Sequence, residues 1–242
     1  MADPAGSVLL FDVDGTLAPI VDDPAAARLA DGIEARLDAL AGRYRVVGAV
    51  SGRPVSFLAA HLPASVSLSG LYGLESQVAG RRTDHPEAER WRPAVATAAA
   101  RAAALGPPAM VVEPKGLSVT LHYRTDPRLE SEVIALATRL GEEVGLEVRP
   151  AKMSVELHPP VDADKGTALL ALAAGARQVL YAGDDRGDLP AFDALDRMAR
   201  DGVHVSRVAV GGPELPVELR DRADVVLDGV EAVPALLDAL SA

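Results

Sequence analysis

Two acidic segments stand directly after short apolar runs, and their spacing could hold a divalent cation. Phe-Asp-Val-Asp-Gly-Thr-Leu at 11–17 closes the run at 7–11, and Gly-Asp-Asp-Arg-Gly-Asp at 183–188 closes the run at 178–182. Either segment alone could be a solvated turn or a helix cap. If both converge, their carboxylates repel one another unless a cation sits between them. Oxygen ligands without His or Cys favour Mg²⁺.

Continuous apolar runs predict the strands that must position these carboxylates. The runs at 7–11, 44–50 and 178–182 do not alternate with polar residues, which is typical of strands buried on both faces of a parallel sheet. A helical pattern at about 25–40 separates the first two runs, as in a strand-helix-strand unit. Ligands bind beyond the carboxyl ends of parallel strands, so Ser51 should join the two acidic segments at one edge.

The rest of the chain predicts further strands and helices of the same α/β core, with one different region inserted in the middle. Further helices are predicted at about 165–174, 189–199 and 230–240, and further strands at 179–182 and 204–210. The middle predicts helix, two strands, helix and two strands, at 87–105, 109–113, 117–123, 126–144, 146–149 and 154–158, with a hairpin turn at 114–116. We therefore predict an α/β core formed by residues 1–80 and 160–242, with an α+β domain inserted at 81–159.

Composition excludes several classes of protein. The 242 residues carry a net charge of −11, 49% are apolar, 3% are aromatic, and there is no cysteine. An acidic chain poor in aromatics lacks the features of a nucleic-acid binder, and without cysteine there is no disulfide framework. The first residues lack a positive segment before an apolar run, so we expect no signal peptide, and no apolar run reaches the roughly 18 residues of a membrane helix. We expect a soluble, cytoplasmic monomer with no nucleic-acid or membrane partner.

Four ordered segments resemble the motifs of the haloacid dehalogenase (HAD) superfamily of phosphoryl-transfer enzymes. They are Asp-Val-Asp-Gly-Thr at 12–16, Ser-Gly-Arg-Pro at 51–54, Asp-Lys-Gly at 164–166, and the acidic segment at 183–188. The resemblance implies a Rossmann-like core with a parallel sheet and a large α+β cap of the C2 type. The fourth motif departs from the superfamily pattern at Gly187, Leu189 and Pro190, which leaves the role of Asp188 open.

The resemblance also implies roles for individual residues. Asp12 would be the nucleophile that forms an aspartyl phosphate, and Asp14 would be the general acid and base. Ser51 and Lys165 would hold the phosphoryl oxygens. Thr16 and Arg53 are additional candidates for substrate contacts, although Thr16 could equally be a turn residue. Mg²⁺ would be bound by Asp12, by Asp14 through its backbone carbonyl and by Asp184, with Asp185, and in one reading Asp188, acting indirectly or through a water molecule.

In and just before the inserted region, the chain resembles one family more narrowly, the trehalose-6-phosphate phosphatases, and this resemblance extends along nearly the whole chain. The matching segments lie at 70–75, 113–119, 122–124 and 152–157. A disaccharide offers many hydroxyl groups, so its site needs carboxylate acceptors beside cationic donors. The resemblance implies sugar contacts from Glu75, Glu113, Lys115, Arg124, Lys152 and Glu156. Each could instead be an ordinary surface charge, and Glu75 could be a buried structural partner.

The predicted activity is Mg²⁺-dependent hydrolysis of trehalose 6-phosphate to trehalose and phosphate, as in trehalose biosynthesis. One alternative is another capped sugar-phosphate phosphatase, acting on sucrose phosphate or a glycosyl phosphoglycerate. A second alternative is a catalytically silent sugar-phosphate sensor. The nucleophile and acid two residues apart argue against the sensor, because a binding protein needs neither.

Overall fold

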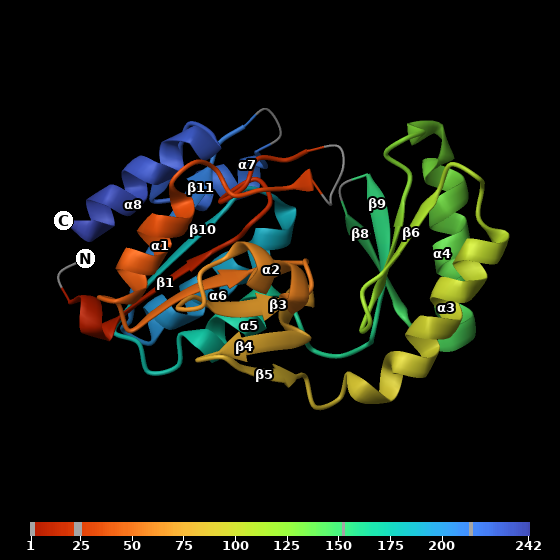
Figure 1. Ribbon diagram of the computed structural model, residues 1–242, viewed down its shortest axis with the longest axis horizontal. Coiled ribbons are helices and arrows are strands. Elements are labelled where there is room, and N and C mark those ends of the chain that lie inside the picture. The colour runs from red at the N-terminus through yellow and green to blue at the C-terminus, as the bar shows by residue number, and fades with distance from the viewer. Residues whose placement is uncertain (1–2, 22–25, 152, 213–214) are drawn as a thin grey trace. The chain divides into compact units, whose positions relative to one another are not determined.

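The chain forms two compact units. The computed structural model describes residues 3–21, 26–151, 153–212 and 215–242. One unit combines Met1–Thr83 with Ala163–Ala242, and the other is Asp84–Asp162. We call them the main unit and the inserted unit. In Figure 1 the main unit has the colours of the two ends of the scale, red to orange and teal to blue, and the inserted unit has the yellow and green colours of its middle.

The main unit is built on one mixed sheet of eight strands (Figure 1). From β12 to β3 all neighbours pair in parallel, and β4 runs antiparallel to β3. Parallel order confirms the predicted α/β class. In spatial order the strands are β12 (Val225–Leu227), β11 (His204–Val210), β10 (Gln178–Gly183), β1 (Ser7–Phe11), β2 (Val46–Val50), β3 (Ser67–Gly70), β4 (Glu75–Val78) and β5 (Arg81–Asp84).

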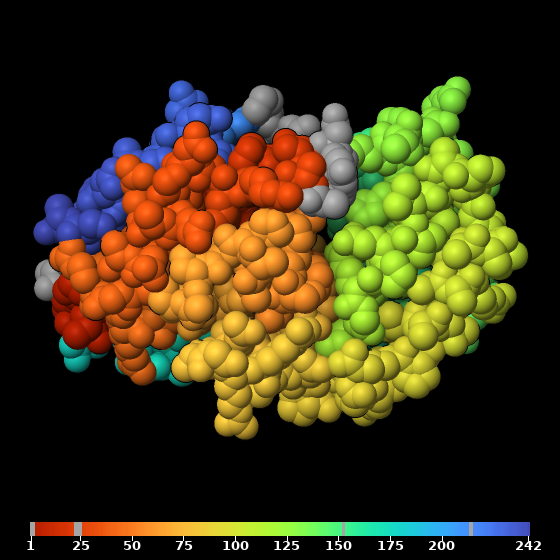
Figure 2. Space-filling view, viewed as in Figure 1, coloured from red at the N-terminus to blue at the C-terminus, as the bar shows by residue number. Residues whose placement is uncertain are grey.

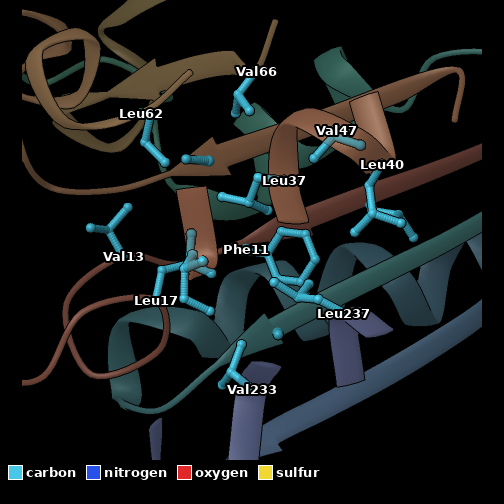
Figure 3. Packing of buried hydrophobic residues seen from close by; sticks show 14 of the residues in the cluster. Phe11, Val13, Leu17, Leu37, Leu40, Val47, Leu62, Val66, Val233 and Leu237 are labelled. Carbon is cyan, nitrogen blue, oxygen red and sulfur yellow. The ribbon is translucent and has the colours of Figure 1, made fainter. Parts of the chain in front are cut away.

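Helices cover both faces of this sheet. Phe11 of β1 packs against Leu37 of α1 (Ile33–Ala41) and Leu237 of α8 (Val233–Ser241) in the cluster of Figure 3. Side chains alternate along a strand, so Val8 and Leu10 face the other way, into a second cluster with α5 (Lys165–Leu172) and α6 (Leu189–Arg200). The two remaining helices of this unit are α2 (Val55–His61) and α7 (Val217–Arg222). Burial on both faces explains the continuous apolar run of β1.

In two places the main unit differs from the sequence predictions. Residues 27–32 are not helical, and α1 begins only at Ile33 because Gly32 has a left-handed backbone with φ of 74°. No strand is predicted in the polar stretch after Gly80, yet residues 81–84 form strand β5, and Arg82 within it pairs with Glu75 at 2.8 Å. All four residues of β5 are exposed, so the strand carries no hydrophobic signal.

The inserted unit is a four-stranded antiparallel sheet with two helices. The spatial order is β6 (Val111–Pro114), β7 (Val119–His122), β9 (Ser154–His158) and β8 (Glu147–Ala151). Helices α3 (Arg92–Leu105) and α4 (Glu130–Val144) pack on one face of this sheet, against apolar side chains of β7 and β9. The outer side of α3 is exposed and forms much of the yellow-green surface in Figure 2. The other face of the sheet carries polar side chains.

Across the described ranges, no helix is both long and apolar enough to cross a membrane.

Candidate active site

Three strand ends of the main unit converge at one edge of its sheet. Asp12 directly follows β1, and its backbone N–H donates to the carbonyl of Ala182 in β10 at 2.8 Å. Asp184 directly follows β10, and Ser51 directly follows β2. In parallel register Phe11 lies opposite both Ala182 and Ala49. The parallel pairing of the strands therefore brings together side chains that are up to 172 positions apart, counted from Asp12 to Asp184.

Three carboxylates form a cluster that could hold a metal ion. One oxygen each from Asp12, Asp184 and Asp188 lies within 4.8 Å of the other two. Thr16 is fully buried, and its hydroxyl lies 3.5 Å from Asp184. Gly15 has φ of 88°, and a Cβ there would lie 2.1 Å from an oxygen of Asp184. Glycine is therefore needed for both the turn and the close approach of Asp184.

The electrostatics of this cluster fit a divalent cation. Burial, followed by the charges of Asp188 and Asp185, raises the pKa of Asp184 to about 7. Burial also raises the pKa of Asp12 well above its usual range, reinforced by Asp188 and Asp184 and opposed by Lys165. Raised pKa values mean that the folded chain holds more negative charge here than it can stabilise by itself. A cation with oxygen ligands would relieve that excess.

Lys165 and Asp188 form a buried ion pair beside Asp12. The Lys165 ammonium lies 2.7 Å from Asp188 and 2.9 Å from Asp12. Burial would lower the pKa of Lys165, but Asp12 and Asp188 outweigh burial and leave that pKa raised. Asp188 also accepts hydrogen bonds from the Tyr181 hydroxyl at 2.6 Å and from the backbone N–H groups of Asp184 and Asp185. Four donors thus hold the buried Asp188 carboxylate in one orientation.

Asp14 and Ser51 are both linked to Arg53. The Arg53 guanidinium donates to both oxygens of Asp14, from Nε at 2.8 Å and from Nη2 at 2.7 Å. The backbone N–H of Arg53 donates to the Ser51 hydroxyl oxygen at 3.1 Å, and Ser51 is buried. One residue therefore orients two of the groups predicted to act on substrate.

The cluster of three carboxylates contains two of the predicted metal ligands, Asp12 and Asp184, together with Asp188. Asp188, whose role the sequence left open, joins Asp12 and Asp184 in the cluster. The Asp185 side chain instead caps the short helical turn Arg186–Asp188 by accepting from the Gly187 N–H at 2.8 Å. The Asp14 carboxylate contacts Arg53, which leaves only its backbone carbonyl in the predicted metal role.

The polar face of the inserted sheet gathers three of the residues predicted to bind sugar. The Lys115 ammonium lies between two carboxylates, 3.9 Å from Glu113 and 3.8 Å from Glu156. His122 of β7 also contacts Glu113 at 2.8 Å. Arg124 follows β7 and is partly exposed. Lys152 lies outside the described residues.

Glu75 is not part of that group, because it lies on β4 of the main unit. It is buried, and its two carboxylate oxygens accept from the backbone N–H of Val55 and from Arg82, both at 2.8 Å. Val55 is the first residue of α2, so Glu75 caps the start of that helix. This is the structural alternative that the sequence left open.

Two polar residues that lie beside the candidate site residues, Tyr181 and Thr120, were not predicted from the sequence. Tyr181 lies inside the apolar run of β10, where nothing distinguishes it from a core residue, yet its hydroxyl contacts Asp188. Thr120 lies in β7 between Glu113 and Glu156, and only the alternation of polar and apolar residues in that strand could have indicated it.

A parallel α/β sheet with an aspartate after its first strand, a buried lysine beside it and carboxylates after a neighbouring strand is the arrangement that the haloacid dehalogenase motifs in the sequence imply. Solved structures agree with that fold. The match to the crystal structure of a trehalose-6-phosphate phosphatase related protein covers 97% of this chain and 96% of that chain, with a TM-score of 0.79 and 22% sequence identity. The C-terminal domain of the C. albicans trehalose-6-phosphate phosphatase covers 99% and 93%, with TM-score 0.78 at 24% identity.

Sequence comparison narrows the class to one family. The trehalose-phosphatase family matches residues 10–224. A trehalose-phosphate phosphatase of Mycobacterium avium is 36% identical over 199 residues, covering 77% of this chain. The chain belongs to the trehalose-phosphatase family. It spans about half the length of that curated relative, 51%, and 15% of an uncharacterized glycosyl hydrolase of Mycobacterium tuberculosis that is also 36% identical.

Proposed function

We propose that this protein hydrolyses trehalose 6-phosphate to trehalose and phosphate, with Mg²⁺, through an aspartyl phosphate on Asp12. The observation that carries the proposal is the buried Lys165 ammonium 2.9 Å from the Asp12 carboxylate, at the edge where Asp14 and Asp184 also lie. Membership of the trehalose-phosphatase family supports the choice of sugar.

In the first step an Asp12 oxygen attacks phosphorus in line with the leaving oxygen, and the P–O bond to the sugar breaks. One Asp14 oxygen takes up a proton in place of its hydrogen bond to Arg53 and passes that proton to the leaving oxygen. In the second step Asp14 takes a proton from the water that hydrolyses the aspartyl phosphate. Arg53 holds Asp14 through two hydrogen bonds, so the acid is aligned before substrate arrives.

The phosphoryl oxygens are held by Ser51 and Lys165. Ser51 accepts from the Arg53 N–H, which leaves its own hydroxyl hydrogen to donate to a phosphoryl oxygen. Lys165 is oriented by Asp188, which we assign to positioning because its oxygens already accept from four donors. Thr16 lies against Asp184 and would keep that carboxylate in place.

Asp12, Asp184 and the backbone carbonyl of Asp14 would hold Mg²⁺, which would supply positive charge to offset the repulsion between the attacking carboxylate and the phosphate. In this assignment Asp185 acts indirectly, by shaping the turn that carries Asp188.

We further propose that the inserted unit is the specificity cap and binds the leaving sugar. Glu113 and Glu156 would accept from sugar hydroxyls, and Lys115 would donate to them. Arg124 and Lys152 are candidates for further contacts, while Glu75, with both oxygens bonded within the main unit, is assigned to structure. Small soluble sugar phosphates then require neither a membrane nor nucleic acid, and we expect the enzyme to work in the cytoplasm as a monomer.

Phosphate release from a panel of substrates tests the function. The purified chain is incubated with trehalose 6-phosphate, sucrose 6-phosphate, glucosyl phosphoglycerate and glucose 6-phosphate, with Mg²⁺ or with EDTA. We expect the highest kcat/KM for trehalose 6-phosphate and loss of turnover in EDTA. A preference for another member of the panel would refute the assignment of substrate, and release that persists in EDTA would refute the role of the cation.

A further inference from the structure

One row of four side chains crosses the polar face of the inserted sheet. Glu113 of β6 lies opposite Thr120 of β7, Thr120 lies opposite Glu156 of β9, and Glu156 lies opposite Arg149 of β8. Residues directly opposite one another point to the same face with Cβ atoms about 5 Å apart. The side chain of Thr120 therefore lies between the side chains of Glu113 and Glu156 on this face.

Two residues that lie opposite each other in this row each have a side-chain atom without a hydrogen-bond partner. In the parts of the chain that the structure describes, Thr120 Oγ1 and Glu156 Oε1 are buried and unbonded, and both residues are 2% exposed. Ser118 Oγ, two residues before Thr120, is a third such atom. Buried polar atoms in folded proteins nearly always have a partner, so unbonded atoms on two opposite residues indicate a ligand that completes them.

The surrounding charges select the kind of ligand. Glu113 and Glu156 contribute two negative charges, and Lys115, which lies between them, and Arg149, which is opposite Glu156, contribute two positive charges. The row therefore has no excess charge of either sign to attract a phosphate or a metal ion. A neutral hydroxyl group suits the row, because it can donate to Glu156 and accept from Thr120.

We propose that Thr120 is a sugar-binding residue whose hydroxyl, together with Glu156 Oε1, binds neighbouring hydroxyl groups of the leaving sugar. The proposal rests on the proposed function in that the ligand is the sugar of the substrate. It adds a residue that belongs to none of the charged groups already assigned to that sugar. The residue acts on binding of the sugar and takes no part in chemistry at phosphorus.

Thr120→Val tests the proposal, because valine has the same shape and the same preference for strands but no hydroxyl. We expect KM for trehalose 6-phosphate to rise about tenfold with kcat changed less than twofold, which is the effect of one lost hydrogen bond. Turnover of p-nitrophenyl phosphate, which has no sugar hydroxyls, should be unchanged. The melting temperature without ligand should stay constant or rise, since the unbonded hydroxyl is removed.

Two further variants complete the experiment. Thr120→Ser keeps the hydroxyl and should restore KM to within about threefold of the wild type. Thr138→Val is the matched control, because Thr138 is exposed on α4 and its hydroxyl bonds only to Ile134 in its own helix. This control should change neither KM nor melting temperature.

An unchanged KM in Thr120→Val would overturn the proposal, as would a fall of several degrees in its melting temperature, which would show that the hydroxyl has a partner within the protein. Binding of trehalose itself, followed by calorimetry on wild type and variant, separates this proposal from the proposed function. If the wild type releases no phosphate from trehalose 6-phosphate, the proposed function fails. Trehalose binding that is weakened by Thr120→Val would still support the role of Thr120, and no difference between the two would overturn it.

Discussion

Arg53 holds Asp14 by both carboxylate oxygens, with Nε at 2.8 Å from one and Nη2 at 2.7 Å from the other. The guanidinium also lies 4.5 Å from the centre of the Phe57 ring, so its plane is supported from α2. A planar fork of this kind restrains a carboxylate in position and in angle, which a lysine ammonium cannot do. A residue two positions after a motif serine therefore controls the proposed acid.

Arg53→Lys should lower kcat about tenfold to a hundredfold and change KM less, because Asp14 loses its alignment while the phosphate contacts remain. Steady-state kinetics with trehalose 6-phosphate measure both constants. Arg36→Lys is the control, since Arg36 forms the same two-bond contact with Asp238 on the exposed surface. If both variants lowered kcat equally, Arg53 would have no special role in aligning Asp14.

Asp12→Asn should reduce phosphate release at least a thousandfold, because an amide is not a competent nucleophile. The fold should persist, since the change removes one negative charge from a crowded cluster in which the pKa of Asp12 is raised. Melting temperature checks the fold and phosphate release checks the chemistry. Near-normal release by a folded Asp12→Asn protein would rule out the aspartyl phosphate.

Asp188→Asn should destabilise the protein by about 3 kcal/mol, because it leaves the buried Lys165 with one carboxylate fewer. Activity should fall with it, since Lys165 loses its orientation. Tyr181→Phe removes a single donor to the same carboxylate and should cost only about 1 kcal/mol, with most of the activity kept. Urea unfolding of both variants gives the comparison. A smaller loss of stability in Asp188→Asn than in Tyr181→Phe would contradict this account.

Stabilisation by Mg²⁺ should depend on pH. The pKa of Asp184 is about 7 in the folded chain and near 3.8 when unfolded, so between those values the folded state binds more protons than the unfolded state. Without cation, stability therefore falls as pH rises through this window. Mg²⁺ must displace the proton below pH 7 but not above it.

We expect Mg²⁺ to raise the melting temperature by several degrees at pH 8 and by less than half as much at pH 6, measured by thermal unfolding with Mg²⁺ or EDTA. Asp184→Asn should remove most of this difference. A larger gain at pH 6 than at pH 8 would show that Asp184 does not compete with the cation for its proton.

Lys115→Met should raise KM for trehalose 6-phosphate about tenfold and lower the melting temperature, because Glu113 and Glu156 lose the cation between them. Turnover of p-nitrophenyl phosphate should change little. Arg101→Met is the control, since Arg101 pairs with Glu143 between the two exposed helices of the same unit. Loss of discrimination against glucose 6-phosphate only in Lys115→Met would support the role in sugar binding, and equal behaviour of both variants would count against it.

Local patterns were enough to predict several elements of the sheet. The strand Ser7–Phe11 has the predicted bounds, because a buried strand requires continuous apolar residues and polar residues end it. His204–Val210 also has the predicted bounds, although its first four residues are exposed or half-buried. The hairpin was predicted from the turn residues at 114–116; it is present, but Pro114 is the last residue of β6 and the turn follows it. The strands β3, β4 and β5 were not predicted, since they are four residues long and two of them are largely polar.

The sequence by itself determined which carboxylates and which serine stand at the ends of which strands, and that Lys165 begins a helix, because hydrophobic burial acts on contiguous residues. Only the tertiary structure decided that Asp188 joins Lys165 and Tyr181, that Arg53 grips Asp14, and that Thr120 lies between two carboxylates. Each of these contacts depends on strand register or on the packing of segments that are distant in the sequence. The spacing of residues along the chain does not show which distant residues meet, whereas the folded sheets determine it.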